Sequence, residues 1–302
     1  MATKTTTTTN NAALDEQDKI KKRSKFADTW RLFKKKKTAV LGLIIFGFII
    51  LAVVVAPIFV DPALAIDQDY DVIMKGPSAA HPFGTDDLGR DLLARVLYGG
   101  RNSLTIGLVS MVCALFMGVV IGSLCGYYGG TLDQIVMRLL DVIKAIPTTV
   151  LALAIVAALG ASMTNLILAI MIAQTPAQVR LVRSAVIKIA AMEYFEACRA
   201  CGTGTVRIIF KHIVPNCIGT VIIQASMAMS QMILQAASLS FIGMGIQPPE
   251  PEWGAMLSGA REYMSTAPWL MLFPGLFIML SAYSFNLVGD GLRDALDPRL
   301  RT

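Results

Sequence analysis

The sequence predicts an all-α integral membrane protein with six membrane-spanning helices. Hydrophobic residues make up 55% of the 302-residue chain and charged residues only 16%, a balance unlike that of a soluble domain. The charges are also segregated, because five long runs contain no Asp, Glu, Lys or Arg. These runs are Thr38–Val60, Asn102–Leu132, Ala145–Val179, His212–Pro249 and Tyr263–Gly289. A helix needs about 20 apolar residues to cross the hydrocarbon core, so each run can hold at least one crossing.

Two of these runs, Ala145–Val179 and His212–Pro249, are predicted to hold more than a single crossing helix. Gly160-Ala161-Ser162 interrupts the third run, which together with an amphipathic lead-in from Leu132 is predicted to form two helices. The fourth run is predicted to hold one crossing and an apolar segment that folds back at the outer surface. With one helix in each of the other three runs, the expected total is six.

The distribution of Lys and Arg predicts the orientation. Cytoplasmic loops of membrane proteins carry an excess of these residues. With both termini in the cytoplasm, 22 of the 27 basic residues fall on that side, in segments 1–37, 129–144, 180–212 and 290–302. We therefore expect a multi-pass membrane protein with both termini in the cytoplasm. The net charge of +6 then reflects topology and contact with membrane lipid, and it does not indicate a nucleic-acid partner.

The chain divides into five predicted parts. The first residues are of low complexity, which is typical of disorder. Trp30 and Phe33 precede the first apolar run and favour an interfacial helix. The parts are a disordered cytoplasmic tail (1–25), the interfacial helix (26–37), a first transmembrane helix (38–60), an extracytoplasmic loop (61–101) and a five-helix core (102–302) with a short helix at about 190–203.

The segment Glu193–Asn216 is a polar interruption between apolar runs, and its first half has a helical pattern. Polar residues recur at three-residue spacing, at Glu193, Glu196 and Arg199. A second, apolar stripe is predicted at Tyr194, Ala197 and Cys201. Gly202 stands where a left-handed residue would end the helix, a conformation that glycine adopts at least cost. A short helix that ends in glycine just outside a membrane is typical of a docking element.

The same segment resembles a known signature. Glu196-Ala197-Cys198, followed by Gly202 and by Pro215 thirteen residues later, is similar to the EAA motif of permease subunits of ABC importers. The residues at Cys198, His212 and Val214 depart from the usual pattern, but the spacing of the glycine and the proline is intact.

This resemblance implies that the short helix is a coupling helix, which seats in a groove of an ATP-binding subunit. Glu193 would lie in this helix. Glu196 and Arg199 would pair with charged groups at the rim of the groove. Ala197 would stay small for close approach, and Gly202 would set the turn.

The outer loop carries a second motif. Its residues are Gly84, Thr85, Asp86, Gly89, Arg90 and Asp91. Thr85 or Asp86 is predicted to cap a helix from about 87 to 99. A calcium loop is disfavoured, because the acidic spacing lacks the DxDxDG start and the glutamate at position twelve. The motif resembles the HxxGTDxxGRD signature of C-type permeases in oligopeptide, dipeptide, glutathione and nickel importers. Further similar stretches are Gly126–Gly130, Ala237–Gly243, Glu252–Leu257 and Phe285–Arg299.

The resemblance covers about residues 26–302 and implies a type I ABC importer permease fold. It implies partners as well: a homologous second permease, one or two ATP-binding subunits and an extracytoplasmic solute-binding protein. The sequence contains no GxxxxGK[ST] P-loop, so ATP and Mg²⁺ are expected in the partner ATPase subunits, with no cofactor in this chain. Di- or oligopeptides are the expected cargo, with nickel, a metallophore or glutathione as alternatives.

Three glutamines in the fifth predicted helix suggest a transport path. Gln224, Gln231 and Gln235 fall within about 40° of one helical face. Polar groups in membrane helices usually face a partner or a cavity. The stripe therefore either faces the translocation path or forms hydrogen bonds between helices, and the pattern leaves both open. Gln174 and Asn286, like Asn165, are isolated and are interpreted as packing contacts.

Two other functional classes are disfavoured. Ion-driven secondary transporters generally carry Asp, Glu or His near the bilayer midplane, and no predicted span has a charge at its centre. A metal or redox site at Cys198 and Cys201 would need further ligands, and no second Cys or His pair lies nearby in the sequence. No metal site is therefore predicted.

Overall fold

The computed structural model describes residues 25–296. The predicted tail up to residue 24 and residues 297–302 lie outside the described part. The described helices are α2 (Lys25–Lys35), α3 (Lys37–Phe59), η1 (Pro62–Ala65), η2 (Tyr70–Val72), α4 (Leu92–Tyr128), α5 (Gly130–Ala145), α6 (Thr148–Leu159), α7 (Met163–Ala190), α8 (Glu193–Ala200), α9 (Thr205–Arg207), the π-helix η3 (Ile208–Ile213), α10 (Val214–Phe241), α11 (Trp253–Ala260), η4 (Arg261–Tyr263) and α12 (Trp269–Leu296).

Five helices of the described chain are long and apolar enough to cross a membrane, and a bent pair supplies the sixth span. The five are α3, α4, α7, the continuous stretch α9–α10 and α12. The bent pair is α5 and α6, whose axes differ by 84°. The bend falls at Ile146 and Pro147, because the residue before a proline is pushed out of the helical region, and Ile146 is extended. The six predicted spans are confirmed when this pair is taken as one.

The predicted break after α6 is also present. Gly160 has a φ of +92°, and Ser162 caps α7 by accepting a hydrogen bond from the backbone N–H of Asn165. The side chain of Asn165 donates to the carbonyls of Leu159 and Gly160, so it closes the end of α6, in agreement with its interpretation as a packing contact.

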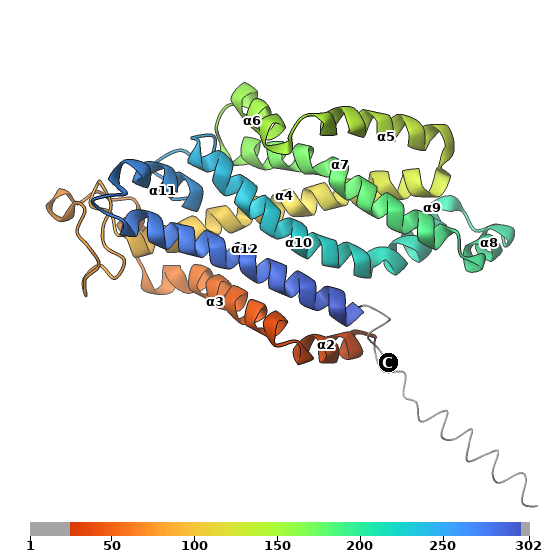
Figure 1. Ribbon diagram of the computed structural model, residues 1–302, viewed down its shortest axis with the longest axis horizontal. Helices are drawn as coiled ribbons and strands as arrows, with labels where there is room; N and C mark the ends of the chain where they lie inside the picture. The colour runs from red at the N-terminus through yellow and green to blue at the C-terminus, as the bar shows by residue number, and fades with distance from the viewer. Residues whose placement is uncertain (1–24, 297–302) are drawn as a thin grey trace, which may run out of the picture.

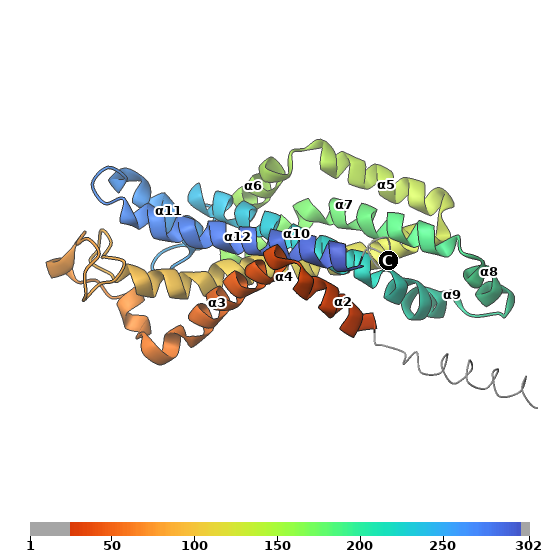
Figure 2. The ribbon, with the colours of Figure 1, turned by 60° about the horizontal axis from the view of Figure 1, so that its bottom comes forward.

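The long helices run side by side along the length of the molecule (Figures 1 and 2). One end carries α8 and α9, and we refer to it as the α8 end. The opposite end carries α11 and the segment between α3 and α4, and we refer to it as the loop end. In both views α5 lies along the outside of α7.

The most extensive helix–helix interface joins α4 and α7, and glycines make it possible. Gly118, Gly122 and Gly126 recur at every fourth residue of α4. A Cβ atom added to Gly118 would lie 2.7 Å from Cβ of Gln178, and one added to Gly122 would lie 2.7 Å from the carbonyl oxygen of Val179. Helices in a membrane associate through such close packing of small residues. The backbones of α4 and α7 are therefore in direct contact.

Two ion pairs hold α5 against α7. The guanidinium group of Arg183 on α7 donates two hydrogen bonds to the carboxylate of Asp133 in the first turn of α5. Arg180, one turn earlier on α7, donates to Asp141 at 2.5 Å. Both aspartates belong to α5 and both arginines to α7, so the pairs act along one shared edge.

At the loop end, a buried carboxylate joins α11 to α4. Glu252 has no exposed surface, and it caps α11 by accepting hydrogen bonds from two backbone N–H groups of the first turn. It also accepts one from the hydroxyl of Ser103 on α4, at 2.7 Å. Trp253 donates from its ring nitrogen to the carbonyl of Val96 at 2.8 Å. A buried charge is tolerated only when it is hydrogen-bonded in this way.

A proline in α3 creates the site that anchors α3 to α4. Pro57 has no N–H, so the carbonyl of Val53, four residues earlier, loses its helical partner. Arg101 on α4 donates to this carbonyl from Nε at 3.1 Å and to that of Val54 from Nη2 at 3.4 Å. The arginine supplies the hydrogen bond that the proline removes.

The α4–α7 interface leads to a stability prediction. We expect Gly122→Ala to destabilise the fold by about 1–3 kcal/mol, because the added methyl group would overlap the backbone of α7. The measurement is the midpoint of thermal unfolding of the purified protein in detergent. Gly47→Ala in α3 is the matched control, because nothing lies within 4 Å of a Cβ added there. Equal midpoints for the two variants would contradict the close packing.

Candidate functional site

The short helix α8 projects from the end of the bundle (Figure 1). Glu193 and Glu196 are exposed on it. Gly202 has a φ of +71°, and the N–H of Thr203 donates to the carbonyl of Cys198 at 3.2 Å, so the helix ends in the expected glycine turn. Ala197 and Arg199 lie in α8, but their side chains are outside the described part of the structure. The roles expected of these two side chains therefore stay predictions.

A phenylalanine anchors α8 to the bundle. Phe195 is only 1% exposed and packs into an apolar cluster made of Val182, Val186, Ile208, Ile213, Cys217 and Val221. Tyr194 lies beside it, and its hydroxyl group is 3.0 Å from Nδ1 of His212. The predicted apolar stripe was wrong in this respect, because Tyr194 is 54% exposed and Cys201 is exposed. Phe195 faces inward because this apolar cluster on the bundle surrounds its ring.

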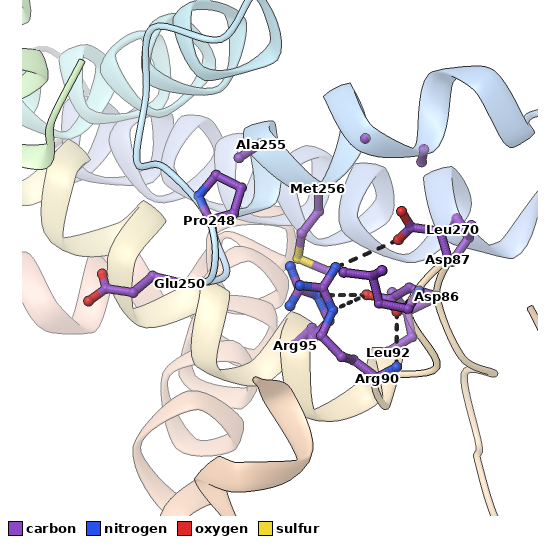
Figure 3. A pocket seen from close by; sticks show the side chains of 13 residues that line it. Asp86, Asp87, Arg90, Leu92, Arg95, Pro248, Glu250, Ala255, Met256 and Leu270 are labelled. Atoms are coloured by element: carbon purple, nitrogen blue, oxygen red, sulfur yellow. Dashed lines mark hydrogen bonds and ion pairs between the residues drawn. The ribbon is translucent and has the colours of Figure 1, made fainter. Parts of the chain in front are cut away.

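The second motif, in the segment between α3 and α4, is a buried cluster of charges (Figure 3). The carboxylate of Asp86 lies between two guanidinium groups, 2.7 Å from Nε of Arg90 and 3.3 Å from Nε of Arg95. The other carboxylate oxygen of Asp86 accepts hydrogen bonds from the backbone N–H groups of Leu88 and Arg90. All three charged side chains are nearly inaccessible, so the motif forms the core of the loop.

The predicted start of the helix after this motif was wrong. Helix α4 begins at Leu92 and not near residue 87, and it continues to Tyr128 and does not end at residue 99. Its cap is Asp91, which accepts a hydrogen bond from the backbone N–H three residues later. No helix begins after Asp86, because Gly89 has a φ of +77° and turns the chain three residues later. The hydroxyl of Thr85 is engaged by Lys75 and Val72 across the loop.

The glycines of the motif fold the loop onto itself. Gly84 and Gly89 have φ values of +83° and +77°, in the region that favours glycine. A Cβ atom on Gly89 would overlap the backbone carbonyl of Asp69. The structure thus brings all six predicted motif residues into one compact turn. A pocket of about 230 Å³ adjoins them, lined on its other side by α11 residues such as Met256.

A cavity of about 360 Å³ opens between three helices in the middle of the bundle. Its lining residues are Gln174, Ala177, Gln178 and Leu181 of α7, Gln224, Met227, Ala228 and Gln231 of α10, and Asn286 of α12. Among these described lining residues none carries a charge and five carry an amide. Gln231 is exposed, so the cavity reaches the surface of the chain.

The three predicted glutamines do not share one environment. Gln224 and Gln231 line the cavity. Gln235 is 7% exposed and joins helices, because it accepts a hydrogen bond from Gln174 at 2.7 Å and donates to the carbonyl of Thr148 at 3.4 Å.

Sequence reasoning missed Gln178, and it placed Gln174 and Asn286 among packing contacts only. Asn286 does accept a hydrogen bond from Ser230 at 2.7 Å, yet both it and Gln174 also line the cavity. The four-residue spacing of Gln174 and Gln178 on α7 was the available signal.

These features define a class of protein: a multi-pass, all-α membrane protein. A solved structure with the same fold is the inward-facing methionine ABC transporter MetNI, with a TM-score of 0.56, 18% sequence identity, and coverage of 67% of this chain and 97% of that chain. The fold is the type I ABC importer permease fold, as predicted.

The family is given by sequence comparison. Residues 118–302 match the family described as binding-protein-dependent transport system inner membrane component, and residues 24–77 match the N-terminal transmembrane domain of oligopeptide transport permease C. The chain belongs to this family of permeases, in its oligopeptide and dipeptide branch.

Individual relatives cover almost the whole chain. The dipeptide transport system permease protein DppC of Alkalihalophilus pseudofirmus is 44% identical over 92% of this chain and 91% of its own length. A di/tripeptide transport system permease protein of Pseudomonas aeruginosa is 43% identical over 92% of this chain and 93% of its own. The glutathione transport system permease protein GsiD of Pectobacterium atrosepticum is 41% identical over 93% of both.

The loop motif predicts a large effect from one conservative change. We expect Asp86→Asn to lower stability by about 3–5 kcal/mol, because it leaves the buried guanidinium group of Arg95 without a carboxylate and that of Arg90 with only the more distant Asp87. Asp87→Asn is the control, since the side chain of Asp87 is 39% exposed and lies 3.6 Å from Arg90. The midpoint of thermal unfolding measures both. If Asp86→Asn lowered the unfolding midpoint as little as Asp87→Asn does, the charge cluster would not organise the loop.

A second pair of variants separates the glutamines. We expect Gln235→Leu to destabilise the bundle by about 1–3 kcal/mol, because it removes the hydrogen bonds of the buried amide of Gln235 to Gln174 and to the carbonyl of Thr148. Gln224→Leu should change stability by less than about 0.5 kcal/mol, because Gln224 is only partly buried and has no hydrogen-bond partner within the described chain. Urea or thermal unfolding in detergent distinguishes them, and the reverse order of stabilities would refute the assignment.

Proposed function

We propose that this chain forms, together with a homologous second permease, the membrane path of an ATP-driven importer of di- or oligopeptides. Relatives that are more than 40% identical over most of the chain are named for dipeptide and di/tripeptide transport, which supports this cargo. An extracytoplasmic solute-binding protein delivers the peptide. Glutathione is the second candidate, because an equally complete relative is named for glutathione transport, and glutathione is itself a small peptide.

The observation that carries the coupling proposal is α8, an exposed helix firmly anchored at one end of the bundle. Its exposed Glu193 and Glu196 are available to a partner, while Phe195 fixes the helix to α7 and α10. An ATP-binding subunit receives α8 in a groove. Ala197 allows close approach there, Arg199 and Glu196 pair with charges at the rim, and Gly202 sets the turn that ends the helix.

The path of the movement follows from the packing. The cluster around Phe195 contains residues of α7 and α10, the two helices that supply most of the cavity lining. When two ATPase subunits close on ATP and Mg²⁺, the displacement of α8 is passed to these helices and changes access to the cavity. Hydrolysis takes place in the partner subunits, and this chain contributes no catalytic group.

The orientation follows from charge. The α8 end faces the cytoplasm, because the segments around α2, α5 and α8 hold most of the basic residues. Both termini then lie in the cytoplasm of a bacterial or archaeal cell. The loop end faces outward and meets the solute-binding protein, with the buried charges of Asp86, Arg90 and Arg95 holding the shape of that surface. Apolar side chains exposed on α3, such as Phe48 and Leu51, contact membrane lipid.

Purification from the native membrane in mild detergent tests this proposal. A second permease, one or two P-loop ATPases and a solute-binding protein should co-purify. The reconstituted complex should transport a labelled dipeptide only when ATP is present on the side of the membrane that carries the ATPases. Recovery of the chain alone, with uptake driven by an ion gradient without ATP, would overturn it.

A charge reversal tests the role of α8. We expect Glu196→Arg to reduce ATP-dependent uptake by about tenfold or more, because like charges at a docking rim cost at least about 1.4 kcal/mol. Glu262→Arg is the control for the amount of co-purified ATPase, since Glu262 is also exposed but lies in η4 at the loop end, away from α8. Uptake in proteoliposomes and the amount of co-purified ATPase are measured together. Normal coupling in the Glu196 variant, or equal loss in both variants, would contradict the docking role.

A further inference from the structure

An apolar slot opens between α2, α3 and the last turns of α12. We refer to it as the α2 slot. Its lining residues are Thr29, Trp30 and Phe33 of α2, Leu43 of α3, and Val288 and Leu292 of α12. The volume is about 150 Å³, and an apolar cavity of that size accommodates a molecule such as benzene. Five of the six lining residues are hydrophobic, so the slot suits several methylene groups of a hydrocarbon chain.

Two stacked aromatic rings form the α2 side of the slot. Phe33 is 3% exposed and fits against Gly291 of α12, where an added Cβ atom would lie 2.9 Å from its ring. Trp30 stacks on Phe33, with the ring centroids 5.7 Å apart and the planes at 4°. Trp30 is 41% exposed. Phe33 therefore fixes α2 to α12, while Trp30 stays accessible in the wall of the slot.

Basic side chains accompany this wall. The ammonium group of Lys34 lies 5.2 Å from the centroid of the Trp30 ring, and Lys35 and Lys37 are exposed. Residues 25–37 include six basic residues and one acidic residue. Lys36 is engaged by Asp294 of α12, with 2.5 Å between the nitrogen and the carboxylate oxygen. The surroundings of the slot thus keep an excess of positive charge after this ion pair is formed.

The slot extends from the basic segment toward the hydrocarbon layer. Leu43 follows Lys36 by seven residues, which is about 10 Å along the axis of α3. Helix α3 is one of the membrane-crossing helices, so Leu43 lies deeper in the bilayer than the lysines. A phospholipid has the same order of groups, with its phosphate at the surface and its acyl chains inward. Basic segments beside a membrane helix attract anionic lipids.

A second groove on α3 shows that apolar surface and positive charge do not always coincide. It is lined by residues such as Phe48, Leu51 and Leu97, and its volume is about 280 Å³. None of its described lining residues is basic. This groove offers an acyl chain the same kind of contact but gives no reason to select a headgroup.

We propose that the α2 slot binds an anionic phospholipid such as phosphatidylglycerol. Part of one acyl chain occupies the slot, and the phosphate lies among Lys34, Lys35 and Lys37. Charge favours this occupant over the amino-terminal segment of the chain itself, because residues 19–23 include four basic residues and no acidic one. The site requires only that α3 crosses the membrane, so it depends neither on the cargo nor on the role of α8.

Trp30 provides a probe for the test. The chain has three tryptophans, and the other two, Trp253 and Trp269, lie in the core of the loop end. The full chain, purified in mild detergent, is titrated with phosphatidylglycerol that carries bromine on its acyl chains, since bromine quenches the fluorescence of a nearby tryptophan. Phosphatidylcholine with the same chains is titrated in parallel.

We expect phosphatidylglycerol to reach half-maximal quenching at a concentration at least about tenfold lower than phosphatidylcholine does. Each lysine beside an anionic headgroup strengthens binding by about fivefold, and three lysines are available. Trp30→Phe should abolish the quenching that distinguishes the two lipids, because the remaining tryptophans lie at the other end of the bundle.

Two sets of variants separate the headgroup from the acyl chain. The triple change Lys34→Gln, Lys35→Gln and Lys37→Gln leaves the pair of Lys36 and Asp294 intact, and should bring the two lipids within about twofold of each other. Leu43→Phe narrows the slot and should weaken the binding of phosphatidylglycerol by about fivefold or more. Leu51→Phe is the matched control, because it makes the same change on α3 at an exposed residue of the second groove.

Equal concentrations of the two lipids at half-maximal quenching of the wild type would overturn the anionic site. An unchanged response of Leu43→Phe, or an equal loss in Leu51→Phe, would overturn the slot as the place of binding. Absence of quenching by either lipid, or quenching that persists in Trp30→Phe, would do the same. None of these results bears on ATP-driven peptide uptake, which is measured separately.

Discussion

The structure depends on the backbone contact between α4 and α7. Gly122 meets the carbonyl of Val179 with no side chain between them, and Gly118 admits the stem of Gln178 in the same way. In a membrane, where apolar surface gains little by leaving lipid for protein, such close packing is a main source of helix association. Because α4 and α7 cannot separate without exposing this seam, α7 provides a fixed reference for the elements on either side of it.

The other elements are positioned relative to this pair. Arg183 extends from α7 to hold α5 through Asp133. Phe195 fixes α8 against α7 and α10 at one end. At the other end, Ser103 of α4 holds the carboxylate that caps α11. A displacement of α8 thus acts on α7 and α10, the helices that supply most of the cavity lining. A coupling element needs such a connection if ATP binding is to change access to the cavity.

Local features could be predicted from the sequence, whereas tertiary partners could not. Gly202 and the break at Gly160 follow from the backbone preferences of glycine, and both have the expected positive φ. The start of α4 was missed because Gly89 lies in a left-handed conformation against the carbonyl of Asp69, a tertiary contact that no local capping rule includes. Phe195 anchors α8 and the adjacent Tyr194 does not, because the apolar cluster of the bundle faces Phe195. Gln235 and Gln178 differ in role because of neighbours on α6 and α4, which helical periodicity along α10 or α7 alone does not reveal.

The most direct test of the central claim is an electron cryomicroscopy structure of the assembled transporter, determined with and without bound ATP. We expect α8 to sit in a groove of an ATP-binding subunit in both states. We also expect the amide-lined cavity of α7, α10 and α12 to face the second permease, and its access to change from one side to the other while α4 and α7 stay in contact. An ATP-binding subunit that contacts the bundle elsewhere and leaves α8 free, or a path that bypasses this cavity, would contradict the account.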